Sequence, residues 1–190
     1  PWNYPFQLAI YPLVYAIAAG NTAIIKPSEF SSNTANAISI MIKELFDENE
    51  VAVVEGGIPE ATALLALPFN HIHFTGSPKV GKIVMEAAAK NLTAVTLELG
   101  GKSPVIIDGS TNLNSTAEKV CWGKTLNSGQ TCIAPDFALV QENALDGFVE
   151  GFKRACEKFY DPNKKGIDQS KDYGRIINDT NFDRVLALLE

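Results

Sequence analysis

Apolar residues along this chain follow two alternating spacings. Short apolar runs, several of them β-branched, are each followed by a longer segment whose apolar positions recur as on one face of a helix. Expected strands lie at 22–25, 51–54, 71–74 and 93–97, and expected helices at 7–19, about 32–46, 60–67 and 78–90. Strands alternating with helices predict the α/β class, as a Rossmann-like doubly wound parallel sheet.

The same alternation restarts after Gly100-Gly101. Expected strands at 104–108 and 137–141 alternate with expected helices at 113–126 and 143–159, and a polar loop occupies 161–172. We therefore predict a boundary near 99–101, which separates residues 1–99 from residues 100–190. In doubly wound sheets, nucleotides bind at the carboxyl ends of the strands, so the first unit is the expected place for such a ligand.

The composition narrows the classes of partner. Apolar residues make up 46% of the 190 residues, enough for a packed core, and the formal net charge is −6 without a basic block. This balance argues against nucleic acid or an anionic membrane as the main partner and favours a small molecule. The longest apolar stretch, 6–19, is interrupted by Gln7 and Pro12 and is too short to span a bilayer.

The cysteines and the chain ends add two expectations. The three cysteines form no short-spaced pair, which argues against a disulfide framework or a Cys-x-x-Cys metal site and favours a reducing compartment. The chain opens on Pro1 without Met, and the helical run 185–190 has no stop signal. We therefore expect a piece of a longer protein.

Cys132 and Glu98 are the candidate nucleophile and base. Cys132 lies in Gly-Gln-Thr-Cys-Ile-Ala-Pro-Asp, among turn-forming residues that predict an accessible thiol. A free cysteine is more often a small buried apolar residue, and Cys121 and Cys156, both in expected helices, fit that alternative. Glu98 lies two residues before the pair Gly100-Gly101, which permits close approach of backbone, although an exposed acid at the end of a strand explains it equally well.

Two further segments have the form of nucleotide contacts. Thr75-Gly76-Ser77-Pro78-Lys79-Val80-Gly81 joins a strand to a helix whose free N–H groups attract phosphate, although an ordinary turn explains it equally well. Lys26-Pro27-Ser28-Glu29 follows a strand and offers groups for ribose hydroxyls, or else is a solvated turn. His71 and His73 share one face of a strand but lack a third ligand, so no metal is expected.

Five motifs in order carry a resemblance over essentially the whole chain. They are Pro-Trp-Asn-Tyr-Pro-Phe at 1–6, Ala-Gly-Asn-Thr-Ala-Ile-Ile-Lys-Pro-Ser-Glu at 19–29, Phe-Thr-Gly-Ser at 74–77, Glu-Leu-Gly-Gly-Lys at 98–102 and Gly-Gln-Thr-Cys at 129–132. Together they resemble the aldehyde dehydrogenase superfamily. Ile-Ala-Pro-Asp after the cysteine resembles its class 3 branch, which includes the fatty and aromatic aldehyde dehydrogenases.

The resemblance implies a covalent oxidation of an aldehyde to a carboxylic acid. Cys132 would attack the aldehyde to give a thiohemiacetal, which passes hydride to the nicotinamide and becomes a thioester. The Asn3 amide and the Cys132 backbone N–H would form the oxyanion hole, where losing one donor costs roughly 3–4 kcal/mol. Glu98 would activate the water that hydrolyses the thioester.

The resemblance also implies the cofactor contacts and the two domains. Lys26 and Glu29 would bind the adenosine ribose, and Pro27 and Gly100 belong to the same cofactor-binding set. Gly76, Ser77 and Gly81 would line the pyrophosphate, and Thr75 and Leu99 the nicotinamide end. Glu29 favours NAD by repelling a 2′-phosphate, although the class 3 branch accepts NADP as well. Residues 1–99 would be a partial NAD(P)-binding domain and 100–190 the first, incomplete part of an α/β catalytic domain.

Three expectations about the whole protein complete the prediction. Relatives have further sequence on both sides and an oligomerisation arm, and the parent protein is expected to be a cytoplasmic homodimer. This part alone would expose apolar surface that is normally buried, so we expect it to self-associate and to show little or no activity. One alternative is a CoA-acylating aldehyde dehydrogenase, against which Glu98 argues. The other is a dinucleotide-binding fragment without catalysis.

Overall fold

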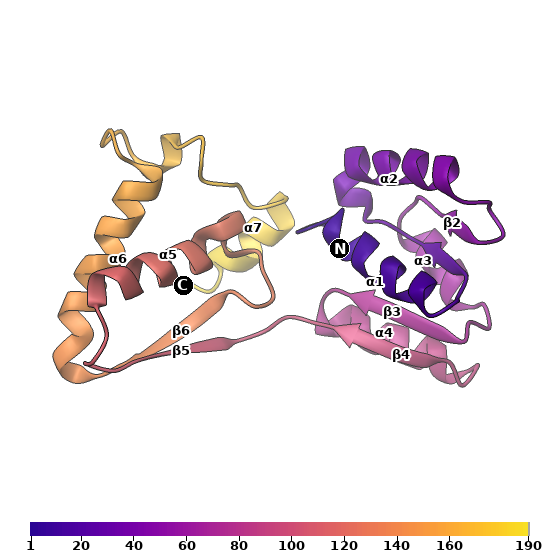
Figure 1. Cartoon of the computed structure of the whole chain (residues 1–190), viewed down its shortest axis with the longest axis horizontal. Helices are drawn as coiled ribbons and strands as arrows, with labels where there is room; N and C mark the ends of the chain where they lie inside the picture. Colours follow the sequence, from indigo (N-terminus) through magenta and orange to yellow (C-terminus); the bar gives the residue numbers. More distant parts are fainter. Residues whose placement is uncertain (190) are drawn as a thin grey trace. The chain divides into compact units, whose positions relative to one another are not determined.

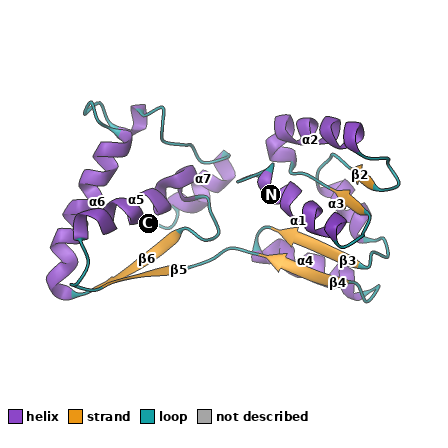
Figure 2. Ribbon diagram, viewed as in Figure 1, coloured by secondary structure: helices purple, strands orange, loops and turns teal. Residues whose placement is uncertain are grey.

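A computed structural model describes residues 1–189 of the chain, which divide into two compact units. The first unit runs from Pro1 to Leu99, and the second begins at Gly100 (Figure 1). Helices and parallel strands alternate in both (Figure 2), so the expected α/β class is confirmed. In the described part of the chain, no helix is long and apolar enough to cross a membrane.

The first unit consists of four helices and four strands. In chain order they are α1 (Gln7–Ala18), β1 (Ala23–Ile25), α2 (Ser32–Leu45), β2 (Val51–Val53), α3 (Ile58–Leu65), β3 (His71–Thr75), α4 (Pro78–Ala89) and β4 (Ala94–Glu98). One cluster of buried residues joins the first four elements, because the apolar faces of α1 and α2 enclose the short strands. Its members are Leu13, Ile25, Ile38, Ile42 and Val51.

The strands of the first unit pair in parallel. β1 pairs with β2, and β3 pairs with β4 in a register that sets Thr75 opposite Glu98. Parallel strands point the same way, so the loops that follow β3 and β4 leave from one edge. The strands of the described residues form two-stranded pairs, so the expected doubly wound arrangement is seen as parallel pairs rather than as one continuous sheet.

The second unit places two long helices against a third parallel pair. It contains β5 (Ser103–Ile107), α5 (Leu113–Thr125), β6 (Pro135–Val140), α6 (Leu145–Tyr160) and α7 (Asp179–Leu186). Ile107, Ala117 and Phe148 form its core. A Cβ built on Gly151 of α6 would lie 2.8 Å from the Ala117 side chain of α5, so the two helices approach closely where both residues are small.

The strand and helix positions expected from the sequence are confirmed to within a few residues. The shift is largest in α3, which begins at Ile58 because the Glu60 carboxylate accepts a hydrogen bond from the Gly57 N–H at 2.7 Å and caps the helix. The expected helical run 185–190 is only the end of α7, which stops at Leu186, and residue 190 lies outside the described residues. The predicted loop 161–172 contains one short 3-10 turn, Ile167–Gln169.

Candidate active site and cofactor-binding residues

Cys132 lies in a short irregular loop between α5 and β6. A tight turn, Leu126–Gly129, follows α5, and a second turn closes where the Ala134 N–H donates to the Thr131 carbonyl at 3.1 Å. Cys132 is partly exposed, and the neighbouring Ile133 is 78% exposed. A thiol in this position can meet a ligand from solvent, whereas a cysteine in the core cannot.

Gly101 packs directly against the backbone of Cys132. A Cβ built on Gly101 would overlap the carbonyl oxygen of Cys132, so only glycine allows this approach. One residue further on, Lys102 Nζ lies 3.3 Å from Asp136 Oδ2, and Lys124 Nζ lies 3.9 Å from Asp136 Oδ1. The ion pairs are largely exposed and weak, so the close backbone packing of Gly101 restrains the loop more than they do.

Gly101→Ala is expected to displace the Cys132 loop. The added methyl group must push the Cys132 carbonyl away, which changes how accessible the neighbouring thiol is to a reagent in solvent. The measurement is the rate at which iodoacetamide alkylates Cys132, followed by mass spectrometry. Gly100→Ala is the matched control, because a Cβ there meets no atom within 4 Å. Equal alkylation rates in the two variants would contradict the steric argument.

The other two cysteines are in a different environment. Cys121 of α5 is fully buried, and its Sγ lies 3.4 Å from Sγ of Cys156 in α6. Burial, with a smaller contribution from the Cys156 thiol, raises the pKa of Cys121 to about 12. Both contribute to the packing between α5 and α6. The predicted burial is confirmed for Cys121, whereas Cys156 is partly exposed.

Cys121 is therefore expected to resist alkylation in the folded protein. With a pKa of about 12, about one thiol in 10⁴ is ionised at pH 8, and the thiolate is the reactive form. Iodoacetamide at pH 8 should label Cys132 while leaving Cys121 unmodified until a denaturant is added, as peptide mass spectrometry can determine. Labelling of both cysteines at similar rates in the native state would be inconsistent with this burial.

In the first unit, Thr75 ends strand β3 and Glu98 ends its parallel partner β4. The two residues lie opposite each other in the register, and the Gly76 N–H donates to the Glu98 carbonyl at 2.9 Å. The Glu98 side chain is exposed. The structure thus brings the predicted base next to the predicted nicotinamide contact Thr75, at the carboxyl edge where parallel sheets bind nucleotides.

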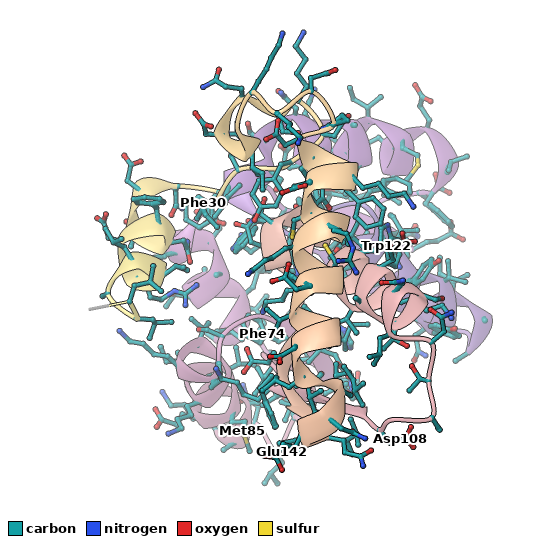
Figure 3. The ribbon with its side chains drawn as sticks, turned by 90° about the vertical axis from the view of Figure 1, so that its left-hand side faces the viewer. Phe30, Phe74, Met85, Asp108, Trp122 and Glu142 are labelled. Carbon is teal, nitrogen blue, oxygen red and sulfur yellow. The ribbon has the colours of Figure 1, made fainter. Side chains whose placement is uncertain are left out.

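The segment after β3 has the features of an anion site. The Ser77 hydroxyl caps α4 by accepting from the Val80 N–H at 3.3 Å, and the Gly81 N–H donates to the Ser77 carbonyl at 2.9 Å. Because Pro78 has no N–H, the Lys79 N–H is the group of this first turn that can donate to a phosphate oxygen. A Cβ on Gly76 would overlap the ring of Phe74, a residue labelled in Figure 3. Gly81 is buried, and a Cβ there would lie 3.0 Å from the Leu99 side chain. Because residues 76 and 81 are glycines, the Phe74 ring and the Leu99 side chain can lie close to the backbone around the start of α4.

Lys26 and Glu29 lie together after β1. Lys26 Nζ lies 3.5 Å from Glu29 Oε2 and donates to the Pro27 carbonyl at 3.0 Å. The Lys26 side chain is 18% exposed and that of Glu29 is 40% exposed, so the carboxylate is the more accessible group. Gly57 follows β2 and lies near this pair, since a Cβ built on it would be 3.9 Å from Glu29 Oε1. A carboxylate and an ammonium group at this edge suit the hydroxyls of a ribose.

The remaining predicted residues divide between the two units. Asn3 is partly buried in the first unit. The backbone carbonyl of its neighbour Trp2 accepts a hydrogen bond from the Ser31 hydroxyl at 3.3 Å. Cys132 and Gly100 belong to the second unit, and Gly100 is exposed. His71 Nε2 pairs with Thr96 Oγ1 at 3.0 Å, and residues 1–189 contain no group of three side chains that would hold a metal.

Two contacts of the Cys132 loop escaped the sequence interpretation. The first is the contact of Gly101 with the Cys132 carbonyl. The Gly100-Gly101 pair is its signal in the sequence, but the pair by itself predicts close backbone approach only near Glu98. The side chain of Gln130 is the other, because it binds backbone more than forty residues away. No local pattern marks such a contact, since it depends on how distant segments pack.

Comparison with known proteins identifies related sequences over the whole chain. A family model described as "Aldehyde dehydrogenase family" matches residues 1–190. The 4,4'-diaponeurosporen-aldehyde dehydrogenase of Staphylococcus aureus is 52% identical over 189 residues, which are 100% of this chain and 40% of that protein. The dimeric NADP-preferring aldehyde dehydrogenase of Rattus norvegicus is 51% identical, with 100% of this chain and 41% of that protein covered.

Solved structures agree with the sequence matches. A substrate-bound state of Staphylococcus aureus AldH superposes with a TM-score of 0.91 at 51% identity, covering 100% of this chain and 41% of that one. An NAD-dependent aldehyde dehydrogenase from Sinorhizobium meliloti gives a TM-score of 0.89 at 32% identity, covering 100% of this chain and 38% of that one. The chain thus spans about 40% of the length of these relatives.

Proposed function

Since this chain belongs to the aldehyde dehydrogenase family, we propose that it supplies the nucleophile, the water-activating base and the nucleotide-binding residues for NAD(P)-dependent oxidation of an aldehyde to a carboxylic acid. The resemblance to the class 3 branch is confirmed, because relatives about 50% identical include aldehyde dehydrogenase family 3 member A2 of Mus musculus. The observation that carries the proposal is the partly exposed Cys132 in a loop held by Gly101, within a chain that matches this family from end to end.

Cys132 acts as the nucleophile. Its thiolate attacks the aldehyde carbon, and the resulting thiohemiacetal places negative charge on the former carbonyl oxygen. The Cys132 N–H and the Asn3 amide are the donors proposed for this oxygen. The close packing of Gly101 against the Cys132 carbonyl supports a role for this backbone, because it limits how the peptide groups of the loop can turn.

Glu98 acts as the general base for hydrolysis. The side chain is exposed at the end of β4, so it can contact water, and the Gly76 N–H fixes its backbone carbonyl. Proton abstraction from water produces the hydroxide equivalent that resolves the thioester on Cys132. In a CoA-acylating enzyme, a thiol would replace this water, and no such base would be needed.

The first unit supplies the proposed dinucleotide contacts. The donor set fits such a cofactor, because the Ser77 hydroxyl at the start of α4 and the Lys26–Glu29 pair after β1 offer polar groups for phosphate and ribose. The first turn of α4 and Ser77 would hold the pyrophosphate, Lys26 and Glu29 the adenosine ribose, and Thr75 and Leu99 the nicotinamide end. Pro27 and, from the second unit, Gly100 complete the proposed cofactor-binding set. When bound, NAD(P) supplies the oxidising power by accepting a hydride from the aldehyde carbon. Glu29 disfavours a 2′-phosphate by charge, so NAD is the preferred form and NADP the alternative.

We also propose a cytoplasmic, homodimeric protein. Three free cysteines support a reducing compartment, and the Rattus norvegicus relative is named as dimeric. The division of labour between a cofactor-binding first unit and a catalytic second unit is part of the same proposal.

The experiment uses this sequence within a polypeptide of the relatives' full length. Aldehyde-dependent formation of reduced nicotinamide is measured with and without CoA, and the product is identified by mass spectrometry. A free carboxylic acid in both conditions supports the proposal. An acyl-CoA product would instead support the acylating alternative, and nucleotide binding without turnover would support a binding module.

A further inference from the structure

The turn that leads into Cys132 has an unusual backbone. Asn127 (φ 52°, ψ 34°), Ser128 (φ 56°, ψ 31°) and Gly129 (φ 75°) are three consecutive residues in the left-handed region. Glycine adopts this conformation freely, but Asn and especially Ser do so at a cost. The Ser128 hydroxyl is buried without a hydrogen-bond partner, so it does not offset that cost. Contacts from outside the turn must hold it.

The Gln130 side chain supplies such contacts. Its Oε1 accepts from the Ile177 N–H at 3.0 Å, and its Nε2 donates to the Arg175 carbonyl at 3.1 Å and to the Asn127 carbonyl at 3.0 Å. Both ends of one amide are therefore used, each matched to the correct backbone group. The amide joins the left-handed turn to the segment 173–177, which lies between α6 and α7.

The segment 173–177 is itself anchored. The Tyr173 ring lies 5.0 Å from the Tyr160 ring at 72°, and the Tyr160 hydroxyl lies 2.7 Å from the Thr125 hydroxyl at the end of α5. The Arg175 guanidinium donates to the carbonyls of Tyr173 and Asp168 at 2.9 and 2.8 Å. Gly174 completes the contact, because a Cβ built on it would lie 2.9 Å from the Ser128 hydroxyl.

We propose that Gln130 is a positioning residue for Cys132. Its amide links the segment 173–177, which contacts α6 through Tyr173, to the left-handed turn that ends at Gly129, three residues before Cys132. This inference rests on the proposed role of Cys132 as the nucleophile. Gln130 acts through the backbone of the loop.

The first test replaces Gln130 by residues of similar length in a polypeptide of the relatives' full length. Gln130→Met keeps the volume and removes all three hydrogen bonds, and Gln130→Glu removes the two donated ones. Both should lower kcat about 10- to 100-fold while KM for the cofactor stays within about 2-fold. Hydrogen exchange of a peptide covering 126–134 should become faster, and that of α5 and α6 should not.

Two further variants make the test specific. Gly174→Ala pushes the Ser128 hydroxyl from the other side and should lower kcat in the same way, so the inference stays testable if Gln130→Met fails to fold. Gln141→Glu is the matched control, because Gln141 Oε1 only accepts from the Gly109 N–H, which a carboxylate also does. It should keep kcat, KM and local exchange at wild-type values.

The outcomes separate this inference from the proposed function. If wild type oxidises aldehydes through Cys132 but Gln130→Met and Gly174→Ala keep full kcat and unchanged exchange at 126–134, Gln130 does not position the thiol. If wild type lacks the activity, or Cys132→Ala retains it, the proposed function fails. In that case, unchanged exchange at 126–134 and an unchanged rate of Cys132 alkylation in Gln130→Met would still overturn the inference that Gln130 positions Cys132.

Discussion

Cys132→Ala is expected to abolish aldehyde oxidation by the full-length protein, lowering kcat by about 10⁴-fold or more. Without the thiol, no thiohemiacetal forms, and the remaining groups have no covalent intermediate on which to act. Binding of NAD(P) should be unchanged, because the proposed cofactor contacts are other residues. The measurements are steady-state turnover and calorimetric titration with NAD.

The matched control is Cys156→Ala. Cys156 is also partly exposed, but it lies in α6 against the buried Cys121, outside the loop of the proposed nucleophile. This variant should keep most of its turnover and lose some thermal stability from the altered packing. Retained turnover in Cys132→Ala, with cofactor binding intact, would remove Cys132 as the nucleophile.

Glu98→Gln is expected to separate the two halves of the reaction. Acylation of Cys132 needs no water-activating base, whereas hydrolysis of the thioester does, so turnover should fall about 10²- to 10⁴-fold. The first turnover should remain fast. A rapid-mixing experiment should therefore show a burst of reduced nicotinamide of about one equivalent per site, followed by a slow steady state, with the acyl group detectable on Cys132 by mass spectrometry.

The matched control is Glu86→Gln in the middle of α4. Glu86 is exposed on a helix of the same unit, and this carboxylate has no place in the proposed chemistry. It should turn over like wild type without a burst. A Glu98→Gln variant that loses the first turnover as well would show that Glu98 acts earlier, and one that hydrolyses normally would exclude it as the base.

Much of the fold was predictable because its signals are local. The β-branched run at 22–25 and the helical spacing after Ser32 each follow from residues within a few positions, and both elements form where expected. The strand expected at 93–97 likewise forms as β4, which ends one residue later, at Glu98. The family was recognisable for the same reason, since each of its motifs is a contiguous stretch.

The candidate site was only partly predictable. Cys132, Glu98 and Thr75 were identified by motif, but their roles stay predictions. The Cys121 and Cys156 pair between α5 and α6 and the capping of α3 by Glu60 depend on side-chain geometry. Neither is encoded in spacing alone.

The sequence by itself determined the α/β class, the order of the elements and the chemical groups available, because spacing and residue type are properties of short segments. The tertiary structure decided how the Cys132 loop is held. Gly101 meets the Cys132 carbonyl from 31 positions upstream, and Gln130 binds Arg175 and Ile177 from 45 and 47 positions away. Such contacts exist only after α5, α6 and the paired strands have packed, since packing brings distant backbone groups within hydrogen-bonding distance and holds Asn127 and Ser128 in a conformation that neither prefers.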